Sequence, residues 1–260
     1  MALAALVATS QASGIGAPPA PIVCAEAGMP VAPASTAVAP APLFTRRDAA
    51  YLLLATTAVG VTAFNDRWAT RRAIAADSHA AREFSRMGEH FGNAPVIASA
   101  LVACDVAGRL AHRPRFTAAS ERVAISVGAS TIAAIVLKEA IGRARPDASP
   151  DDAAHFRPFS GDASFPSGHT AAAFALAAAL QGESRAGWVP WVAYPVATLT
   201  GWSRVRDQRH WASDVLAGAA LGGWLGRKVD AIARRRWRHA WLMAAAPVPG
   251  GGVAVARVVF

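Results

Sequence analysis

Apolar residues are concentrated in six segments, and each segment is bounded by charged residues, Pro or Gly. The segments run over 48–65, 93–111, 121–141, 168–182, 188–205 and 211–229. Several approach the roughly 20 residues that an α-helix needs to cross a bilayer. Because they are rich in Ala rather than Leu, each of them alone also fits a buried helix of a soluble bundle. The pattern therefore predicts an all-α protein built on six helices.

Three features favour a transmembrane bundle over a soluble one. Four Trp residues lie at segment ends, where aromatic belts meet the membrane surface. They are Trp68, Trp188, Trp202 and Trp211. Gly218, Gly222 and Gly226 form a row of small residues that lets helices approach closely in lipid. The arginines at 234–236 follow the last segment as a cytoplasmic flank does. We therefore predict a six-helix transmembrane bundle.

The sequence outside these segments consists of two tails and one polar insert. Residues 1–43 are rich in Ala and Pro and are expected to form a flexible tail, whose first dozen residues faintly resemble a cleaved secretory signal. Residues 66–92 are polar and predict a surface helix or loop at the membrane interface. The helical domain is expected over 44–240. Residues 241–260 are expected to form a second tail, with a short strand as the alternative.

Composition narrows the function classes. Hydrophobic residues make up 53% of the chain and charged residues 17%, which excludes a disordered protein. Lys and Arg exceed Asp and Glu by 26 − 17 = 9. A nucleic-acid partner is not expected, because Lys138 and Lys228 are the only lysines and the surplus consists of Arg among apolar runs. The surplus instead indicates an anion site and charges that flank a membrane.

The remaining polar residues gather in three motifs at the ends of predicted helices. Lys138 to Pro146 closes the third segment, Pro166 to His169 opens the fourth, and Ser203 to Asp214 joins the fifth and the sixth. In an up-and-down bundle these helix ends lie on one face. We therefore expect the three motifs to converge at one site.

The motifs carry groups suited to a phosphate. Lys138, Arg145 and Arg204 can neutralise a phosphoryl group, and Arg can bind its oxygens in a bidentate manner. Ser167 and Gly168 open a helix, so their backbone N–H groups are expected to face the anion. The arginines beside the motifs are expected to be solvated. They are Arg143, Arg206 and Arg209.

Two histidines and a carboxylate add reactive chemistry. His210 and Asp214 are four residues apart on one helix face, so the carboxylate can hold one ring nitrogen and leave the other as a nucleophile or base. His169 is suited to protonating a leaving oxygen. We expect no metal or other cofactor, because the sequence shows no metal-ligand set here and the cations would repel a divalent ion.

In this order, Lys-x6-Arg-Pro, Pro-Ser-Gly-His and Ser-Arg-x5-His-x3-Asp resemble the motifs of the type 2 phosphatidic acid phosphatase / vanadium haloperoxidase superfamily. The resemblance implies that His210 attacks phosphorus to form a phosphohistidine, that Asp214 orients it, and that His169 is the general acid and then the base. It also implies metal-independent hydrolysis and five residues that bind the phosphoryl oxygens. These are Lys138, Arg145, Ser167, Gly168 and Arg204.

We therefore predict a phosphatase of the bacterial inner (plasma) membrane that hydrolyses a lipid phosphomonoester or pyrophosphate. Phosphatidate, phosphatidylglycerophosphate, undecaprenyl pyrophosphate and lipid A all fit the motifs. A soluble periplasmic acid phosphatase, or a haloperoxidase that holds vanadate in the same pocket, is the alternative. Basic residues flanking the non-catalytic helix ends slightly outnumber those at the catalytic ends, which predicts an extracytoplasmic active site. The oligomeric state is open.

Overall fold

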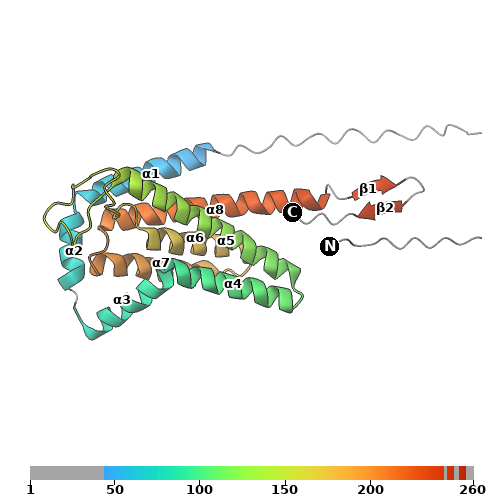
Figure 1. Ribbon diagram of the computed structural model, residues 1–260, viewed down its shortest axis with the longest axis horizontal. Coiled ribbons are helices and arrows are strands. Elements are labelled where there is room, and N and C mark those ends of the chain that lie inside the picture. Colours follow the sequence, from blue (N-terminus) through green and yellow to red (C-terminus); the bar gives the residue numbers. More distant parts are fainter. Residues whose placement is uncertain (1–43, 76, 243–244, 249–251, 256–260) are drawn as a thin grey trace, which may run out of the picture. The chain divides into compact units, whose positions relative to one another are not determined.

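The computed structural model describes residues 44–75, 77–242, 245–248 and 252–255, and in this part of the chain eight α-helices precede two short strands (Figure 1). The helices are α1 (Arg46–Ala63), α2 (Asp66–Ala75), α3 (His79–Gly92), α4 (Ala94–Leu110), α5 (Pro114–Ile141), α6 (Gly168–Glu183), α7 (Val189–Arg206) and α8 (Ala212–Leu242). The strands are β1 (Ala245–Val248) and β2 (Gly252–Val255). The tail predicted over 1–43, with its faint signal sequence, lies outside the described residues.

The all-α prediction is confirmed, because the six apolar segments correspond to α1, α4, α5, α6, α7 and α8. The polar insert 66–92 is helical, as one of the two predicted alternatives has it, and forms α2 and α3. Its buried positions include Asp66 and Gly88, so it is more than a surface segment. Near the C-terminus, β1 and β2 pair in an antiparallel hairpin with Ala245 opposite Val255. The strand offered as an alternative over this tail is therefore present, and it has a partner.

The bundle is organised around α6, which packs against α5, α7 and α8. The buried side chains of α6 are mainly Ala, so neighbouring helices can come close. On α8, Gly218, Gly222 and Gly226 lie against the backbone carbonyls of Ser167, Ala171 and Ala175, with no room for a side chain between the helices. The predicted row of small residues is therefore the contact between α8 and α6.

Close packing at this contact predicts a stability effect. Gly222→Ala would place a methyl group against the carbonyl of Ala171 and is expected to lower the free energy of unfolding by about 1–3 kcal/mol. Thermal unfolding in detergent measures the change. Gly128→Ala on α5 is the matched control, because a Cβ there meets no atom within 4 Å and Ala is the better helix former. Equal midpoints for the two variants would contradict the prediction.

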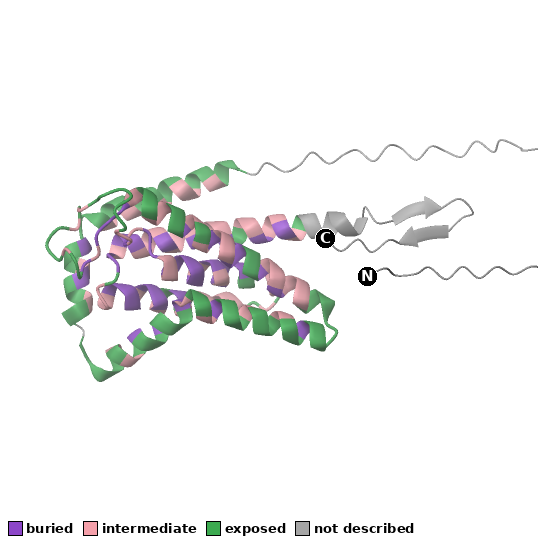
Figure 2. Ribbon diagram, in the orientation of Figure 1, coloured by how far each residue is buried: buried purple, intermediate pink, exposed green. Residues whose placement is uncertain are grey.

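Large apolar side chains lie on the outside of the bundle. Leu54 of α1, Leu110 of α4, Ile132 of α5 and Trp191 of α7 are all more than half exposed. Figure 2 shows this contrast between the largely exposed α1 and α4 and the buried α6. Small residues inside and large apolar residues outside form a distribution that suits a lipid environment.

By length and hydropathy, fewer of the described helices qualify as membrane spans than the six that the sequence predicted. Among the described helices, Pro114–Ile141 is the one that could cross a membrane alone. The segments His79–Gly92 and Ala94–Leu110, bent by 58° relative to each other, pass the same criterion only as a pair. The prediction of six spans therefore stays a prediction.

Candidate active site

The structure brings the three motifs together at one end of the bundle. The last turn of α5, the start of α6 and the connection between α7 and α8 meet there, at the left of Figure 1. A Cβ built on Gly168 would lie 3.5 Å from Cε of Lys138. Burial, together with the neighbouring charges of Arg204 and Lys138, lowers the pKa of His169 to about 4. Residues predicted from separate stretches of sequence thus share one site.

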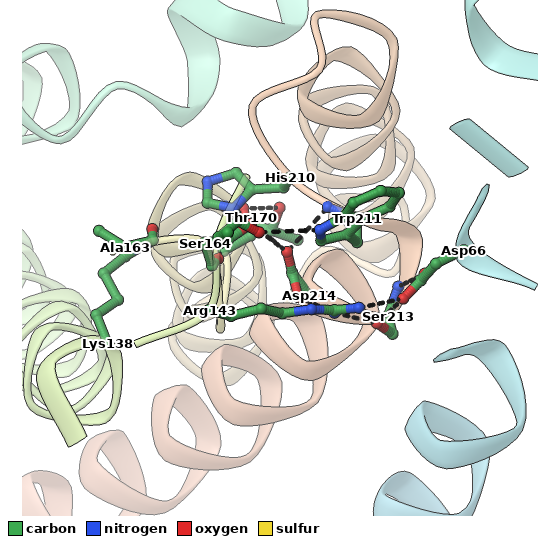
Figure 3. Close-up of polar contacts among 12 residues, drawn as sticks. Asp66, Lys138, Arg143, Ala163, Ser164, Thr170, His210, Trp211, Ser213 and Asp214 are labelled. Carbon is green, nitrogen blue, oxygen red and sulfur yellow. Dashed lines mark hydrogen bonds and ion pairs between the residues drawn. The ribbon is translucent and has the colours of Figure 1, made fainter. Parts of the chain in front are cut away.

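His210 is buried at this site and is held by a backbone carbonyl. Its Nδ1 lies 2.6 Å from the carbonyl oxygen of Ser164 (Figure 3). Because a carbonyl can only accept a hydrogen bond, Nδ1 carries the proton and Nε2 keeps its lone pair. Burial lowers the pKa of His210 below its ordinary value of 6.5. The ring is therefore neutral near pH 7, and Nε2 keeps an unshared lone pair.

Asp214 acts on His210 less directly than the sequence predicted. The distance from His210 Nδ1 to Asp214 Oδ2 is 3.9 Å, beyond a hydrogen bond. Oδ2 instead accepts the Ser164 hydroxyl at 2.5 Å and the backbone N–H of Trp211 at 2.9 Å. Asp214 therefore fixes the segment whose carbonyl orients His210. The i, i+4 spacing correctly predicted that the two residues are neighbours, but His210 precedes α8 and does not share a helix face with Asp214. The spacing also did not reveal Ser164 between them.

Arg143 links the carboxylate of Asp214 to Ser213 and Asp66. Its Nη1 donates to Asp214 Oδ1 at 2.5 Å and to Ser213 Oγ at 2.7 Å, and its Nη2 donates to Asp66 Oδ2 at 2.8 Å (Figure 3). The guanidinium also lies over the ring of Trp211, 5.5 Å from its centroid. Arg143 is only 3% exposed, so the expectation that it is solvated is wrong.

Gly142 explains why Arg143 turns inward. It ends α5 with φ at +59°, in the left-handed region that glycine adopts without strain. A Cβ at Gly142 would collide with the carbonyl of Arg157. Arg157 lies in the loop between α5 and α6, and its backbone N–H donates to the carbonyl of Gly142. The chain therefore leaves α5 in a tight turn, and the next residue points into the site.

Asp66 is a site residue that sequence reasoning missed. It is the first residue of α2, is fully buried, and accepts the backbone N–H of Ser213 at 2.8 Å and the Ser213 hydroxyl at 2.5 Å. One guanidinium, that of Arg143, is thus shared by two buried carboxylates. One sequence signal was available, because Asp66 follows the first apolar segment at the end that alternation places on the catalytic face.

Ser167 has a different role from the predicted one. Its backbone N–H donates to the carbonyl oxygen of Asp214 at 2.9 Å, and its Oγ accepts the hydroxyl of Thr170 at 2.9 Å. The N–H is therefore already used and the side chain caps α6. The N–H groups of Gly168 and His169 make no hydrogen bond to any residue that the structure describes. These two remain available to an anion at the start of α6.

The three predicted cations differ in their partners. Lys138 donates to the carbonyl of Ala163 at 2.5 Å, and Arg204 lies 3.3 Å from a carboxylate oxygen of Glu89. Arg204 also lies 3.3 Å from Asp207. Arg145 has no side-chain hydrogen bond or ion pair within the described ranges. An incoming phosphoryl group would therefore meet the guanidinium of Arg145, which is unpaired among the described residues, a lysine bound to a neutral carbonyl, and an arginine shared by two carboxylates.

Glu89 is a second residue that the sequence did not single out. It reaches Arg204 from α3, which packs on α7 where Gly88 meets the backbone of Leu199. At Gly92, the same helix touches the start of α6 next to His169. The polar insert therefore forms one wall of the site.

A family model matches the part of the chain that carries the three motifs. The model of the PAP2 superfamily matches residues 122–238, which contain all three motifs. This part of the chain is therefore similar to the PAP2 superfamily, in agreement with the motif resemblance. The match leaves out α2 and α3, which supply Asp66 and Glu89.

Individual relatives extend the comparison. A lipid A 1-phosphatase of Porphyromonas gingivalis is 47% identical over 87 residues, which are 33% of this chain and 17% of that protein. A lipid A 1-phosphatase of Rhizobium etli is 44% identical over 102 residues, 36% of this chain and 42% of that protein. The chain thus matches less than half the length of these curated relatives.

Among solved structures, the chain is similar to the first transmembrane PAP2 type phosphatidylglycerolphosphate phosphatase from Bacillus subtilis. The TM-score is 0.55 and the identity 25%, over 72% of this chain and 94% of that one. The helical arrangement described above is therefore similar to that of a membrane PAP2-type phosphatase.

Proposed function

We propose that the chain is a membrane phosphatase that hydrolyses a lipid phosphomonoester through a phosphohistidine at His210. The observation that carries this proposal is the buried His210, whose Nδ1 is tied to the Ser164 carbonyl at 2.6 Å. Its Nε2 is left as the free nucleophilic atom beside the cations of Lys138, Arg145 and Arg204. A neutral nucleophile surrounded by cations suits attack on a phosphate dianion.

In the first step, Nε2 of His210 forms a bond to phosphorus and the bond from phosphorus to the leaving oxygen breaks. A bound phosphate dianion favours the protonated form of His169. His169 then gives its proton to the leaving oxygen, so that the lipid leaves as an alcohol. The proton stays on Nδ1 and is donated to the Ser164 carbonyl, whose dipole stabilises the positive charge that develops on the phosphorylated ring. The cations bind the phosphoryl oxygens and stabilise the negative charge that spreads over these oxygens in the transition state.

In the second step, a water attacks the phosphohistidine. His169, now neutral, accepts a proton from that water, and the bond between Nε2 and phosphorus breaks as inorganic phosphate forms. His169 thereby regains the proton that it lost in the first step. The cycle closes without a change in the charge of the protein.

A lipid substrate is favoured by the surface and by the relatives. Large apolar residues such as Leu54 and Ile132 face outward, which suits a protein that meets its substrate in a membrane. The relatives in Porphyromonas gingivalis and Rhizobium etli are lipid A 1-phosphatases, so the phosphate of lipid A is the first substrate to test. We also propose an inner-membrane location with several spans and the site on the extracytoplasmic face.

The test uses the full chain purified in detergent and assayed for phosphate release in the presence of EDTA. The substrates are lipid A, phosphatidylglycerophosphate and phosphatidate, with a water-soluble aryl phosphate for comparison. Release from at least one lipid, retained in EDTA and absent from a His210→Gln preparation made in parallel, is the expected result. Release from the soluble phosphate alone without detergent or lipid, or loss of activity in EDTA, would overturn the proposal.

The lowered pKa of His210 predicts how the site responds to pH. A folded-state pKa below the ordinary 6.5 means that the unfolded chain binds this proton more tightly. The contribution of His210 to stability is therefore complete above pH 6.5 and is lost as the pH falls towards its folded pKa. Nuclear magnetic resonance of the imidazole C–H, assigned by its absence in His210→Gln, measures the midpoint. A midpoint at or above 6.5 would refute the expectation.

A further inference from the structure

A pocket lined by charged and aromatic side chains lies between α1 and α8, far from the candidate active site. It has a volume of about 300 Å³, and its lining includes Arg47 and Tyr51 of α1 and Trp224, Arg227 and Lys228 of α8. Lys228 follows Asp214 by 14 positions on one helix, which corresponds to about 21 Å at 1.5 Å per residue. We call it the α1–α8 pocket. Its residues are thus too distant to take part in the proposed phosphate chemistry.

The charges of the α1–α8 pocket are only partly balanced. Asp48 accepts a hydrogen bond from Lys228 Nζ at 2.5 Å and one from Trp224 Nε1 at 2.9 Å, so its carboxylate offsets the lysine. The guanidinium of Arg47 has no hydrogen bond or ion pair to a described residue. That of Arg227 lies 5.3 Å from the centroid of the Tyr51 ring and faces no carboxylate in the described part of the chain. Two uncompensated cations, one on each helix, therefore flank the pocket.

Aromatic side chains give the α1–α8 pocket a fixed floor. The Tyr51 hydroxyl donates to the carbonyl of Ala220 at 3.1 Å, and the ring of Trp224 meets that of Phe44 edge-on at 6.4 Å. These contacts matter to the fold because α1 has no buried residue and packs chiefly on α8. The pocket therefore sits on the seam that attaches α1 to the bundle.

We propose that the α1–α8 pocket binds the phosphate-bearing headgroup of an anionic membrane lipid, with Arg47 and Arg227 as its ligands. Arg binds phosphate oxygens through paired N–H groups, and Tyr and Trp favour the headgroup level of a bilayer. Basic pockets between helices at the membrane surface are suited to such headgroups. A headgroup held by Arg47 and Arg227 would bridge the two helices and stabilise the seam. The proposal does not depend on the catalytic activity.

Lipid binding is tested on the full chain in detergent by native mass spectrometry and thermal unfolding. The probes are phosphatidylglycerol, the zwitterionic phosphatidylcholine and inorganic phosphate. We expect retained phosphatidylglycerol and a higher unfolding midpoint with this lipid alone. The Arg47→Gln/Arg227→Gln variant should bind phosphatidylglycerol about tenfold or more weakly, because charge-assisted hydrogen bonds are lost.

The matched control is Arg115→Gln/Arg185→Gln, which removes the same charge from exposed positions outside the pocket. This control is expected to bind phosphatidylglycerol as the wild type does. Equal weakening in both double variants would overturn the proposal in favour of diffuse surface attraction. Equal stabilisation by inorganic phosphate would overturn the assignment to a lipid and leave a site for the free anion. Circular dichroism without lipid shows that each variant is folded.

Discussion

A His210→Gln variant is expected to release phosphate about 10⁴-fold more slowly than the wild type, or slower still, as with nucleophiles that act within a catalytic unit. The side-chain amide of Gln can still donate to the Ser164 carbonyl, so the hydrogen bond that now holds Nδ1 has a replacement. No atom replaces the lone pair of Nε2. The loss should therefore appear in the chemical step and not in folding.

Single-turnover phosphate release measures this effect, and a lipid substrate with radiolabelled phosphate adds a second readout. The wild type should carry an acid-labile label on the protein during turnover, and His210→Gln should carry none. His79→Gln, on an exposed histidine of α3, is the control and should keep both signals. A label that persists in His210→Gln would show that another residue is the nucleophile.

Replacing Arg143 is expected to reduce both stability and activity. In Arg143→Met, Asp66 and Asp214 stay buried without their shared cation, which costs about 3–5 kcal/mol. Arg143→Lys keeps the charge but lacks the planar fork that reaches both carboxylates. Both variants should therefore loosen Asp214 and, through Ser164, the orientation of His210. We expect activity to fall by about 100-fold, as for misplaced catalytic groups.

Thermal unfolding and phosphatase assays on the same preparations separate the two effects. Adding Asp66→Asn to Arg143→Met removes one buried charge, so it should recover part of the stability without recovering activity. Arg209→Gln is the control, because Arg209 lies beside the same motif but is exposed and pairs with Asp147 at the surface. It should change stability by less than about 1 kcal/mol. Full activity in Arg143→Lys would contradict the role of the fork.

The periodicity of apolar residues was sufficient to predict the helices that build the bundle. It also placed the small-residue contact, because Gly218 and Gly222 recur at a spacing that only helix packing explains. The motifs predicted which residues share the site, since alternation of helix direction brings their ends to one face. These predictions rest on regularities that a single sequence displays.

Other features of the site depend on tertiary contacts that no local pattern records. Asp66 and Arg143 look like ordinary charged residues in sequence, and only their burial against each other distinguishes them. The group that orients His210 is a backbone carbonyl at Ser164, which has no residue type to recognise. The hydrogen bond from the Ser167 N–H to the Asp214 carbonyl could not be predicted either, because it joins two backbone groups.

That last hydrogen bond has a mechanical consequence. It joins the first turn of α8 to the cap of α6, while Gly218 lies directly against the carbonyl of Ser167. The segment carrying His210 and the helix start that faces the anion are therefore fastened to each other by backbone, not by long side chains. Bending of α6 or α8 farther along the bundle should then displace the two together, so the distance between His210 and the start of α6 is insulated from motions of the surrounding helices.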